Sequence, residues 1–353
     1  MATNNDDLIT MMGTKVDDCL STKDNFAKYA NVKSIHISGE AKEKTPAVAI
    51  GIPAFKRVNL LRETMQSIFN QKDFDDYEII VSDDNPERGD ETEQYIASLK
   101  SDRIRYFKNE RNIGMTANWN RLVELCRSPY IVLLHDDDLL YPDFLAECMR
   151  LTKIIPDADV IFNTKDTWYA GEPKPVQRNP KQSPLYRLKL PDVLMVCENP
   201  PTGVFMKCQS VKRLGGYDET AYPSCDYYFN VKAICHANVW LYDKHLFIYR
   251  WGQNVSMRYD TLVQFLRQDI PLKKWMMRRM HWPQFLQDIV IEQRSSSMVG
   301  HIGDTHPDKL KGEFDWDIVQ MPKSRIKKAL NQRLTDAYSR FLQWKHRHFS
   351  RKV

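Results

Sequence analysis

Three consecutive carboxylates, Asp136, Asp137 and Asp138, follow a run of apolar residues in the segment IVLLHDDDLL (131–140). Adjacent carboxylates repel one another, so the site needs a cation, solvent or hydrogen-bond donors to compensate their charge. A divalent cation shared with the phosphates of a bound ligand meets this need well. The alternative is a solvated loop or a helix N-cap, where aspartate is also favoured.

An alternation of strand and helix patterns leads up to these acids. Short apolar runs between turn residues predict strands at 47–53, 77–84, 103–109 and 130–135. Apolar residues at helical spacing predict helices at 59–71 and 116–126. This alternation indicates an α/β fold, in which a Rossmann-like, mostly parallel sheet is flanked by helices.

Polar segments follow three of the predicted strands. They read GIPAFKR (51–57), SDDNPERGDE (82–91) and HDDDLL (135–140). Ligands of open parallel sheets bind beyond the carboxyl ends of the strands. We therefore expect the three segments to converge on one crevice, so their acids are site candidates by position as well as by type.

The rest of the chain predicts three parts. Residues 1–45 are polar and weakly patterned, and we interpret them as an N-terminal extension outside the main core. Residues 46–256 form the α/β domain, with a first half at 46–145 and a second half at 146–256. Residues 257–353 are expected to be helical and basic.

Composition favours a soluble protein of the cytoplasm. Of the 353 residues, 42% are apolar and 27% charged, which is ordinary for a globular protein. No run of eighteen apolar residues predicts a membrane span, and the first thirty residues lack the features of a signal peptide. The seven cysteines are scattered without a Cys-x-x-Cys pair, which favours reduced thiols over disulfides or a zinc site.

The positive charge is concentrated at the C-terminal end. Residues 322–353 hold ten Lys and Arg against one acid, Asp336, so this segment carries +9 and the remainder −4 of the total +5. Within it, six apolar residues share one helical face: Ile326, Leu330, Leu334, Ala337, Phe341 and Trp344. Such a helix suits docking to the inner, anionic face of a membrane. Packing on the α/β domain or on a second subunit is the alternative.

Five segments in order, from VAIGIPAFKR through YEIIVSDDNPERGDET, IRYFKN and NERNIGMTANWNR to YIVLLHDDDLLYPDFL, resemble the nucleotide-sugar-binding half of family 2 glycosyltransferases. The resemblance covers roughly residues 46–256. It implies the GT-A fold and metal-assisted transfer of a sugar from a nucleotide diphosphate donor to an acceptor hydroxyl, with inversion.

For the metal, the resemblance places the family's acidic motif at Asp136–Asp138 and implies Mn²⁺ or Mg²⁺. Asp137 occupies the position expected to be a ligand. His135 replaces the usual first acid, which leaves Asp136 or Asp138 as the second contact.

For the donor, the resemblance implies contacts to the base, the nucleoside and the diphosphate. Asp83 and Asp84 match the acidic pair that meets the base. An Asx turn is the alternative, and both can hold at once because a turn can present a side chain to a base. The remaining donor candidates are Pro53, Ala54 and Phe55 in the nucleoside pocket, Asn112 and Gly114 in a turn, Asn118 near ribose or phosphate, and Arg250 near the diphosphate. Arg250 resembles, together with Asn254 and Ser256, the family's Tyr-Arg-x-x-x-Asn-x-Ser ending. Trp119 stands where many members have an arginine, and no histidine follows Arg250.

For the acceptor, Asp226 matches the second acid of the family's Glu-Asp pair at a helix start, with Cys225 in place of the glutamate. The resemblance implies that Asp226 is the general base that takes the acceptor's proton. An N-cap aspartate is the alternative. Asp218 and Glu219 are expected to shape the acceptor loop.

The sequence thus predicts a family 2 glycosyltransferase that uses a nucleotide sugar, with a UDP-sugar as the favoured donor and a glycan or lipid-linked acceptor. Assembly of a bacterial surface polysaccharide or lipopolysaccharide is the expected role. A nucleotidyltransferase is one rival, although no Gly-rich basic loop follows the first strand. A non-catalytic protein that binds a nucleotide sugar or nucleic acid is the other. Nucleic acid is not the expected partner, and the oligomeric state is left open.

Overall fold

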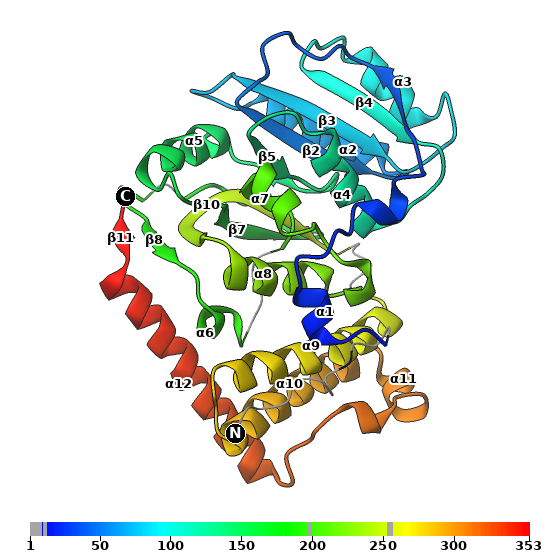
Figure 1. Ribbon diagram of the computed structural model, residues 1–353. Coiled ribbons are helices and arrows are strands. Elements are labelled where there is room, and N and C mark those ends of the chain that lie inside the picture. The colour runs from blue at the N-terminus through cyan, green and yellow to red at the C-terminus, as the bar shows by residue number, and fades with distance from the viewer. Residues whose placement is uncertain (1–8, 10–12, 179, 196–199, 253–256) are drawn as a thin grey trace.

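The computed structural model describes residue 9 and residues 13–178, 180–195, 200–252 and 257–353. Two residues of the sequence motif that begins at Arg250, Asn254 and Ser256, lie outside this part of the chain. In the described part, eleven strands form one sheet in the order β1-β4-β3-β2-β5-β9-β7-β10-β8-β11, with β6 paired to β10. Helices cover both faces of this sheet, and further helices gather at one end of the molecule (Figure 1).

The strands are β1 Ser34–Ser38, β2 Val48–Ala54, β3 Tyr77–Asp83, β4 Ile104–Asn109, β5 Tyr130–Leu133, β6 Leu139–Leu140, β7 Val160–Tyr169, β8 Pro184–Arg187, β9 Val204–Lys207, β10 Val239–Trp251 and β11 Arg351–Lys352. The helices are α1 Val16–Leu20, α2 Val58–Phe69, α3 Glu91–Ser98, α4 Met115–Leu125, α5 Phe144–Ile154, α6 Leu190–Val193, α7 Cys208–Arg213, α8 Cys225–His236, α9 Tyr259–Arg279, α10 Gln284–Thr305, α11 Pro307–Gly312 and α12 Arg325–Phe349.

The strands that precede the acidic segments are parallel. β2 pairs with β3 and β5, and β3 pairs with β4, all in parallel register. β7 and β10 form a second parallel ladder, and the antiparallel β9 joins it to β5. The predicted α/β fold with a helical C-terminal region is confirmed, and the carboxyl ends of β2, β3 and β5 lie at one edge.

The central strands are apolar along their whole length because both of their faces are covered. Ile50 and Ile52 of β2 belong to the core that includes Leu61 and Met65 of α2. Ala49, which precedes Ile50 and points to the other face, belongs to the opposite core, which includes Leu122 of α4. A strand buried on both faces has no polar side, which explains the continuous apolar run in the sequence.

The expectation that residues 1–45 lie outside the core is wrong for the part from residue 13 onward. β1 pairs antiparallel with β4 at the edge of the sheet. Val16, Cys19 and Leu20 of α1 are buried in the same core as α8 and α9. The segment is polar overall, but these few apolar residues are spaced so that one side of a short helix is covered.

Among the residues that the structure describes, no helix combines the length and the apolar character that crossing a bilayer requires.

Candidate active site

The three acids lie in the turn that leads from β5 to β6, which we call the acid turn (residues 135–138). The turn is anchored to α2, because the hydroxyl of Thr64 donates to the backbone oxygen of Asp138 at 2.9 Å. Asp136, Asp137 and Asp138 are all buried. Their charges must therefore be compensated by protein groups or by a bound cation rather than by water.

Arg57, at the start of α2, supplies part of that compensation. Its guanidinium pairs with both oxygens of Asp136 and donates to Asp137 Oδ2 at 2.8 Å. Burial nevertheless raises the pKa of Asp136 to about 7, against the opposing effect of Arg57. Arg57 was not among the predicted site residues. The signal for it is its position in GIPAFKR, directly after a strand that ends at the same edge as the acids.

His135, Asp137 and Asp138 each present a ligand atom, and these atoms lie within 4.8 Å of one another. Burial lowers the pKa of His135 to about 4, so its ring is neutral at pH 7 and carries a free lone pair. Two atoms of the group, His135 Nε2 and Asp138 Oδ2, are buried without a hydrogen-bond partner. A neutral imidazole and two carboxylates with unused acceptors fit a divalent cation.

This group differs from the predicted set in one member. Asp136 pairs with Arg57, and the group includes His135, which was predicted only to replace the family's first acid. The ring of Trp119 stacks on His135 with 5.5 Å between ring centroids. Trp119 thus packs on the imidazole from α4.

Arg250 of β10 lies at the acid turn, and its contact with a diphosphate remains a prediction. Its backbone N–H donates to Asp138 Oδ1 at 2.8 Å, and its Nε donates to the backbone oxygen of Asp137 at 3.0 Å. Its guanidinium also pairs with Glu63 at 2.7 Å and covers the ring of Trp168. A second positive charge therefore stands beside the carboxylates.

Asp83 and Asp84, at the end of β3, are both fully engaged within the protein. Asp83 accepts from Lys108 Nζ at 2.9 Å and from the hydroxyl of Tyr106 at 2.7 Å. Asp84 accepts from the backbone N–H groups of Ile113 and Gly114, each at 2.9 Å, and from Asn109. Contact with a nucleoside base, which remains a prediction, requires Asp84 to give up or share one of these bonds.

Asp84 accepts these backbone hydrogen bonds from the turn at residues 112–114, which was predicted to contact the donor and which we call the donor turn. Asn112 accepts from Gly114 N at 3.1 Å, and Gly114 has φ 87°, a left-handed conformation that favours glycine. Asn118 is buried and bonded to Ser82 through both ends of its amide. Its side chain therefore braces β3 against α4, and a contact with ribose or phosphate remains a prediction.

Pro53, Ala54 and Phe55 were predicted to line the nucleoside pocket. They lie at the carboxyl end of β2, at the same edge of the sheet as the acid turn. Ala54 is buried, Pro53 is half-buried and Phe55 is exposed. An exposed aromatic ring next to the acid turn is available to a planar ligand.

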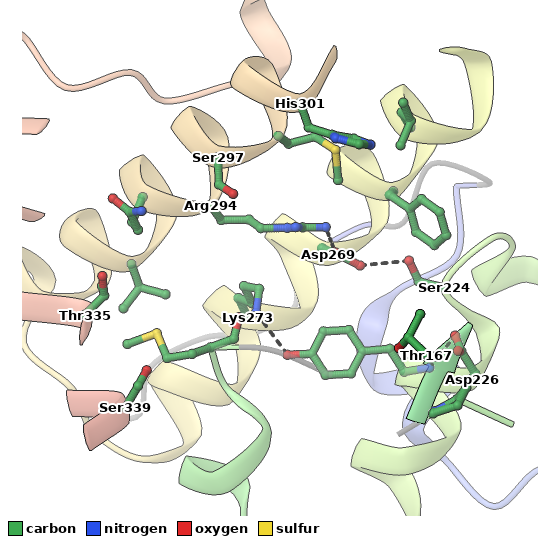
Figure 2. Close-up of a pocket in the computed structure, with 18 of the residues that line it drawn as sticks. Thr167, Ser224, Asp226, Asp269, Lys273, Arg294, Ser297, His301, Thr335 and Ser339 are labelled. Carbon is green, nitrogen blue, oxygen red and sulfur yellow. Dashed lines mark hydrogen bonds and ion pairs between the residues drawn. The ribbon is translucent and has the colours of Figure 1, made fainter. Parts of the chain in front are cut away.

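Asp226 lies at the start of α8 and lines a cavity of about 600 Å³, which we call the Asp226 cavity. Its walls come from β7, α8, β10, α9, α10 and α12, and Figure 2 shows Asp226 and Thr167 toward one side, with Thr335 and Ser339 toward the other. Burial raises the pKa of Asp226 to about 6, and its carboxylate accepts from Tyr227 N. An aspartate that titrates near neutrality is suited to proton transfer.

The helical region holds α8 in place beneath this cavity. The hydroxyl of Ser224, the N-cap of α8, donates to Asp269 of α9 at 2.8 Å, and Asp269 pairs with Arg294 of α10 at 2.5 Å. Lys273 Nζ donates to the hydroxyl of Tyr227 at 3.1 Å (Figure 2). The position of Asp226 thus depends on residues beyond 256.

Asp218 and Glu219 are not brought to the Asp226 cavity. Asp218 pairs with Lys23 at 2.7 Å, and Glu219 accepts from the hydroxyl of Tyr29 at 2.8 Å and pairs with Lys28. The two acids line a separate hollow between α4 and residues 23–29. They fix the N-terminal segment, and any influence on an acceptor remains a prediction.

Strand β10 contacts both parts of the site. Tyr249 and Trp251 line the Asp226 cavity, whereas Arg250 between them donates to the acid turn. The acid turn and the cavity therefore adjoin the end of one strand, although they are built from segments far apart in the sequence.

Residues 49–206 match the family model described as Glycosyl transferase family 2. This match spans the acid turn, Arg57 and the donor turn, and it ends before Asp226 and Arg250. It supports a glycosyltransferase of family 2.

Curated relatives agree with this match over part of their length. The chain is 37% identical over 108 residues to a GalNAc(5)-diNAcBac-PP-undecaprenol beta-1,3-glucosyltransferase of Campylobacter jejuni, covering 30% of this chain and 34% of that protein. It is 30% identical over 190 residues to an uncharacterized glycosyltransferase of Methanocaldococcus jannaschii, covering 52% and 62%. It is 30% identical over 104 residues to the putative colanic acid biosynthesis glycosyl transferase WcaA of Escherichia coli, covering 30% and 37%.

Solved structures share the fold. TarS of S. aureus in complex with UDP-GlcNAc superposes with a TM-score of 0.54 at 15% identity, covering 76% of each chain. The mannosyltransferase PcManGT of Pyrobaculum calidifontis, in complex with GDP-Man and Mn²⁺, gives 0.50 at 12% identity, covering 90% of this chain and 88% of that one. The fold therefore extends beyond the segment that the family model matches.

Proposed function

We propose that this protein transfers a sugar from a nucleotide diphosphate donor to an acceptor hydroxyl, as a metal-assisted, inverting glycosyltransferase of family 2. The observation that carries the proposal is the His135–Asp137–Asp138 group inside the family 2 segment, flanked by Arg57 and Arg250. The Asp226 cavity adjoins the same strand end and supplies a base.

In this reaction the Asp226 carboxylate takes the proton of the acceptor hydroxyl as its oxygen attacks the anomeric carbon. The bond from that carbon to the diphosphate breaks, and the nucleoside diphosphate leaves with both electrons. A single displacement from the opposite side inverts the anomeric centre. The guanidinium of Arg250, which donates to the acid turn, would stabilise the growing negative charge of the leaving group.

His135, Asp137 and Asp138 would hold the cation, which is Mn²⁺ or Mg²⁺. A bound divalent ion neutralises charge on the diphosphate oxygens. Because imidazole suits transition ions better than Mg²⁺, the group favours Mn²⁺. His135→Ala is expected to weaken Mn²⁺ binding, measured by calorimetry, more than Asp136→Asn does, because Asp136 is committed to Arg57.

The relatives support a donor and a pathway for this proposal. TarS, whose fold the chain shares, was solved with UDP-GlcNAc, which favours a UDP-sugar donor. The relatives from C. jejuni and E. coli act on an undecaprenol-linked glycan or in colanic acid biosynthesis, as their names state. A lipid-linked acceptor in the assembly of a bacterial surface glycan, on the inner face of the membrane, is the role that fits both.

The first test is a thermal-shift panel of UDP-, GDP-, CMP- and dTDP-sugars with and without Mn²⁺. A ligand at a hundred times its dissociation constant stabilises a protein by about 2.7 kcal/mol. We expect one nucleotide class to stabilise the wild type only when Mn²⁺ is present. Asp137→Ala abolishes that stabilisation, whereas the exposed Asp102→Ala leaves it intact.

Absence of stabilisation by every donor, with metal and with acceptor present, contradicts the proposal. Release of pyrophosphate from a nucleoside triphosphate by the protein favours a nucleotidyltransferase instead.

A further inference from the structure

Helix α12 is packed in the opposite sense to an ordinary surface helix. Its two buried residues are polar, Asn331 and Thr335. Large apolar side chains lie on its outer side: Ile326 is 82% exposed, Phe341 54% and Trp344 48%. A helix on a water-exposed surface normally turns its apolar side inward, so this orientation requires a cause.

Polar contacts fix the inner side of α12 to the rest of the protein. Asn331 Nδ2 and Lys327 Nζ contact the two oxygens of Glu292 on α10, at 2.7 and 2.5 Å. Near its C-terminal end, Lys345 and His346 lie 3.0 and 3.1 Å from Asp192 Oδ1. With ion pairs at both ends, α12 cannot rotate to bury its apolar side without exposing Glu292 and Asp192 unpaired.

The outer side carries a continuous apolar row, which we call the outer stripe. Its members recur at intervals of three or four residues and therefore share one helix face. They are Ile326, Leu330, Leu334, Ala337, Phe341 and Trp344, and all six are exposed. Phe341 and Trp344 stack on each other with 6.1 Å between ring centroids, which makes one broad aromatic surface.

Arginines run beside the outer stripe. Arg333, Arg340 and Arg347 recur every seven residues, so they form a second row along the flank of the stripe. All three are exposed, and within the described ranges of the chain none of them forms an ion pair. The segment 322–353 carries ten basic residues against one acid.

We infer that the outer side of α12 docks on an anionic lipid surface, with the helix lying flat and the outer stripe among the acyl chains. An amphipathic helix with aromatic residues on one side and arginines at its flank binds in this way. Each arginine near such a surface adds to the attraction. A second copy of the chain is a poorer occupant, because two segments of +9 would meet at its interface.

The inner side of the same helix lines the Asp226 cavity through Gln332, Thr335, Asp336 and Ser339. Docking therefore places one wall of that cavity next to the lipid surface. The value of this arrangement for a lipid-linked acceptor rests on the proposed function. The docking itself rests only on the outer stripe and the arginine row.

The test is flotation of the full chain with vesicles of phosphatidylcholine alone and with 30% phosphatidylglycerol. We expect binding to the anionic vesicles that weakens as salt is added. Arg333→Gln, Arg340→Gln and Arg347→Gln together should weaken it roughly a hundredfold. Ile326→Ser, Phe341→Ser and Trp344→Ser together should abolish it while the melting temperature stays the same, because these side chains are exposed. The matched control removes three exposed charges elsewhere, with Lys72→Gln, Arg127→Gln and Lys212→Gln, and should bind like the wild type.

Three results overturn the inference. The first is equal affinity of the wild type and both α12 variants for anionic vesicles. The second is a dimer in sedimentation that the serine variant dissociates, because a second copy then covers the stripe. The third is binding to RNA but not to vesicles. None of these measurements depends on sugar transfer, so failure of the docking and failure of the proposed function are distinguishable.

Discussion

The acid turn and the Asp226 cavity handle charge in different ways. In the acid turn, Arg57 pairs with Asp136 and Asp137, and Arg250 donates to Asp138 and to the backbone of Asp137. In the cavity, Asp226 accepts one hydrogen bond from the neighbouring backbone, and burial raises its pKa to about 6. The first arrangement places guanidinium groups beside several buried carboxylates, whereas the second leaves one carboxylate with a backbone donor.

The two parts also differ in how they are assembled. Residues 54–138 supply most of the acid turn and the side chains that support it. They lie within residues 49–206, which match the family 2 model. The cavity draws on strands and helices from Lys165 to Ser339. The acid turn is thus encoded mainly by one segment, whereas the cavity is built from many segments that lie far apart in the sequence.

The largest effect is expected at Asp226. Asp226→Asn keeps the shape of the side chain but cannot take a proton, so the transfer rate should fall by roughly 10² to 10⁴. Donor binding, followed by thermal shift with Mn²⁺, should be unchanged, because the acid turn is intact. A transfer rate within twofold of the wild type would show that Asp226 is not the base.

The second prediction concerns the pH dependence of transfer, which tests the Asp226 cavity and not the acid turn. A base must be deprotonated, and the pKa of Asp226 is raised to about 6. The value of kcat/KM should therefore be level above that pH and fall about tenfold for each unit below it. Asp226→Glu should move this limb while keeping measurable activity. An unmoved limb in this variant assigns the titration to another group.

Asp269→Asn should disturb the cavity and leave the acid turn unaffected. Asp269 is buried and joins Ser224 to Arg294, so its neutralisation should lower the free energy of unfolding by about 1–3 kcal/mol. Transfer should slow while stabilisation by the donor persists. The matched control is Asp315→Asn, because the Arg267–Asp315 pair is exposed and should contribute less than about 1 kcal/mol. Equal losses of unfolding free energy in the two variants would contradict the conclusion that α9 and α10 hold α8 in place.

The smallest expected effect concerns the donor turn. Gly114 has φ 87° and ψ 162°, a backbone conformation almost reserved for glycine, and open space around it, so Gly114→Ala should cost about 1–3 kcal/mol through backbone strain alone. Gly300, inside α10, also has open space, and Gly300→Ala should stabilise the protein by about 0.5–1 kcal/mol. Urea unfolding measures both. Changes of the same sign would contradict the left-handed turn.

Much of the fold follows from the sequence because apolar pattern acts locally. The predicted helix at 116–126 is α4 at Met115–Leu125, and the predicted strand at 103–109 is β4 at Ile104–Asn109. The acids of the acid turn were placed at a strand end for the same reason. The segment before residue 46 was misjudged, because β1 is short and its pairing with β4 is a contact between distant residues.

What only the tertiary structure decided is which partner each polar side chain meets. The sequence by itself determined the parallel strands, the acids at their carboxyl ends and the apolar row near the C-terminus. It did not determine that Arg57 pairs with Asp136, or that His135 lies beside Asp137 and Asp138. It also did not determine that Asp84 accepts hydrogen bonds from the donor turn. It also did not determine that α12 turns its apolar row outward. Element type depends on neighbours along the chain, whereas a charged side chain is stabilised by groups that folding brings from far away.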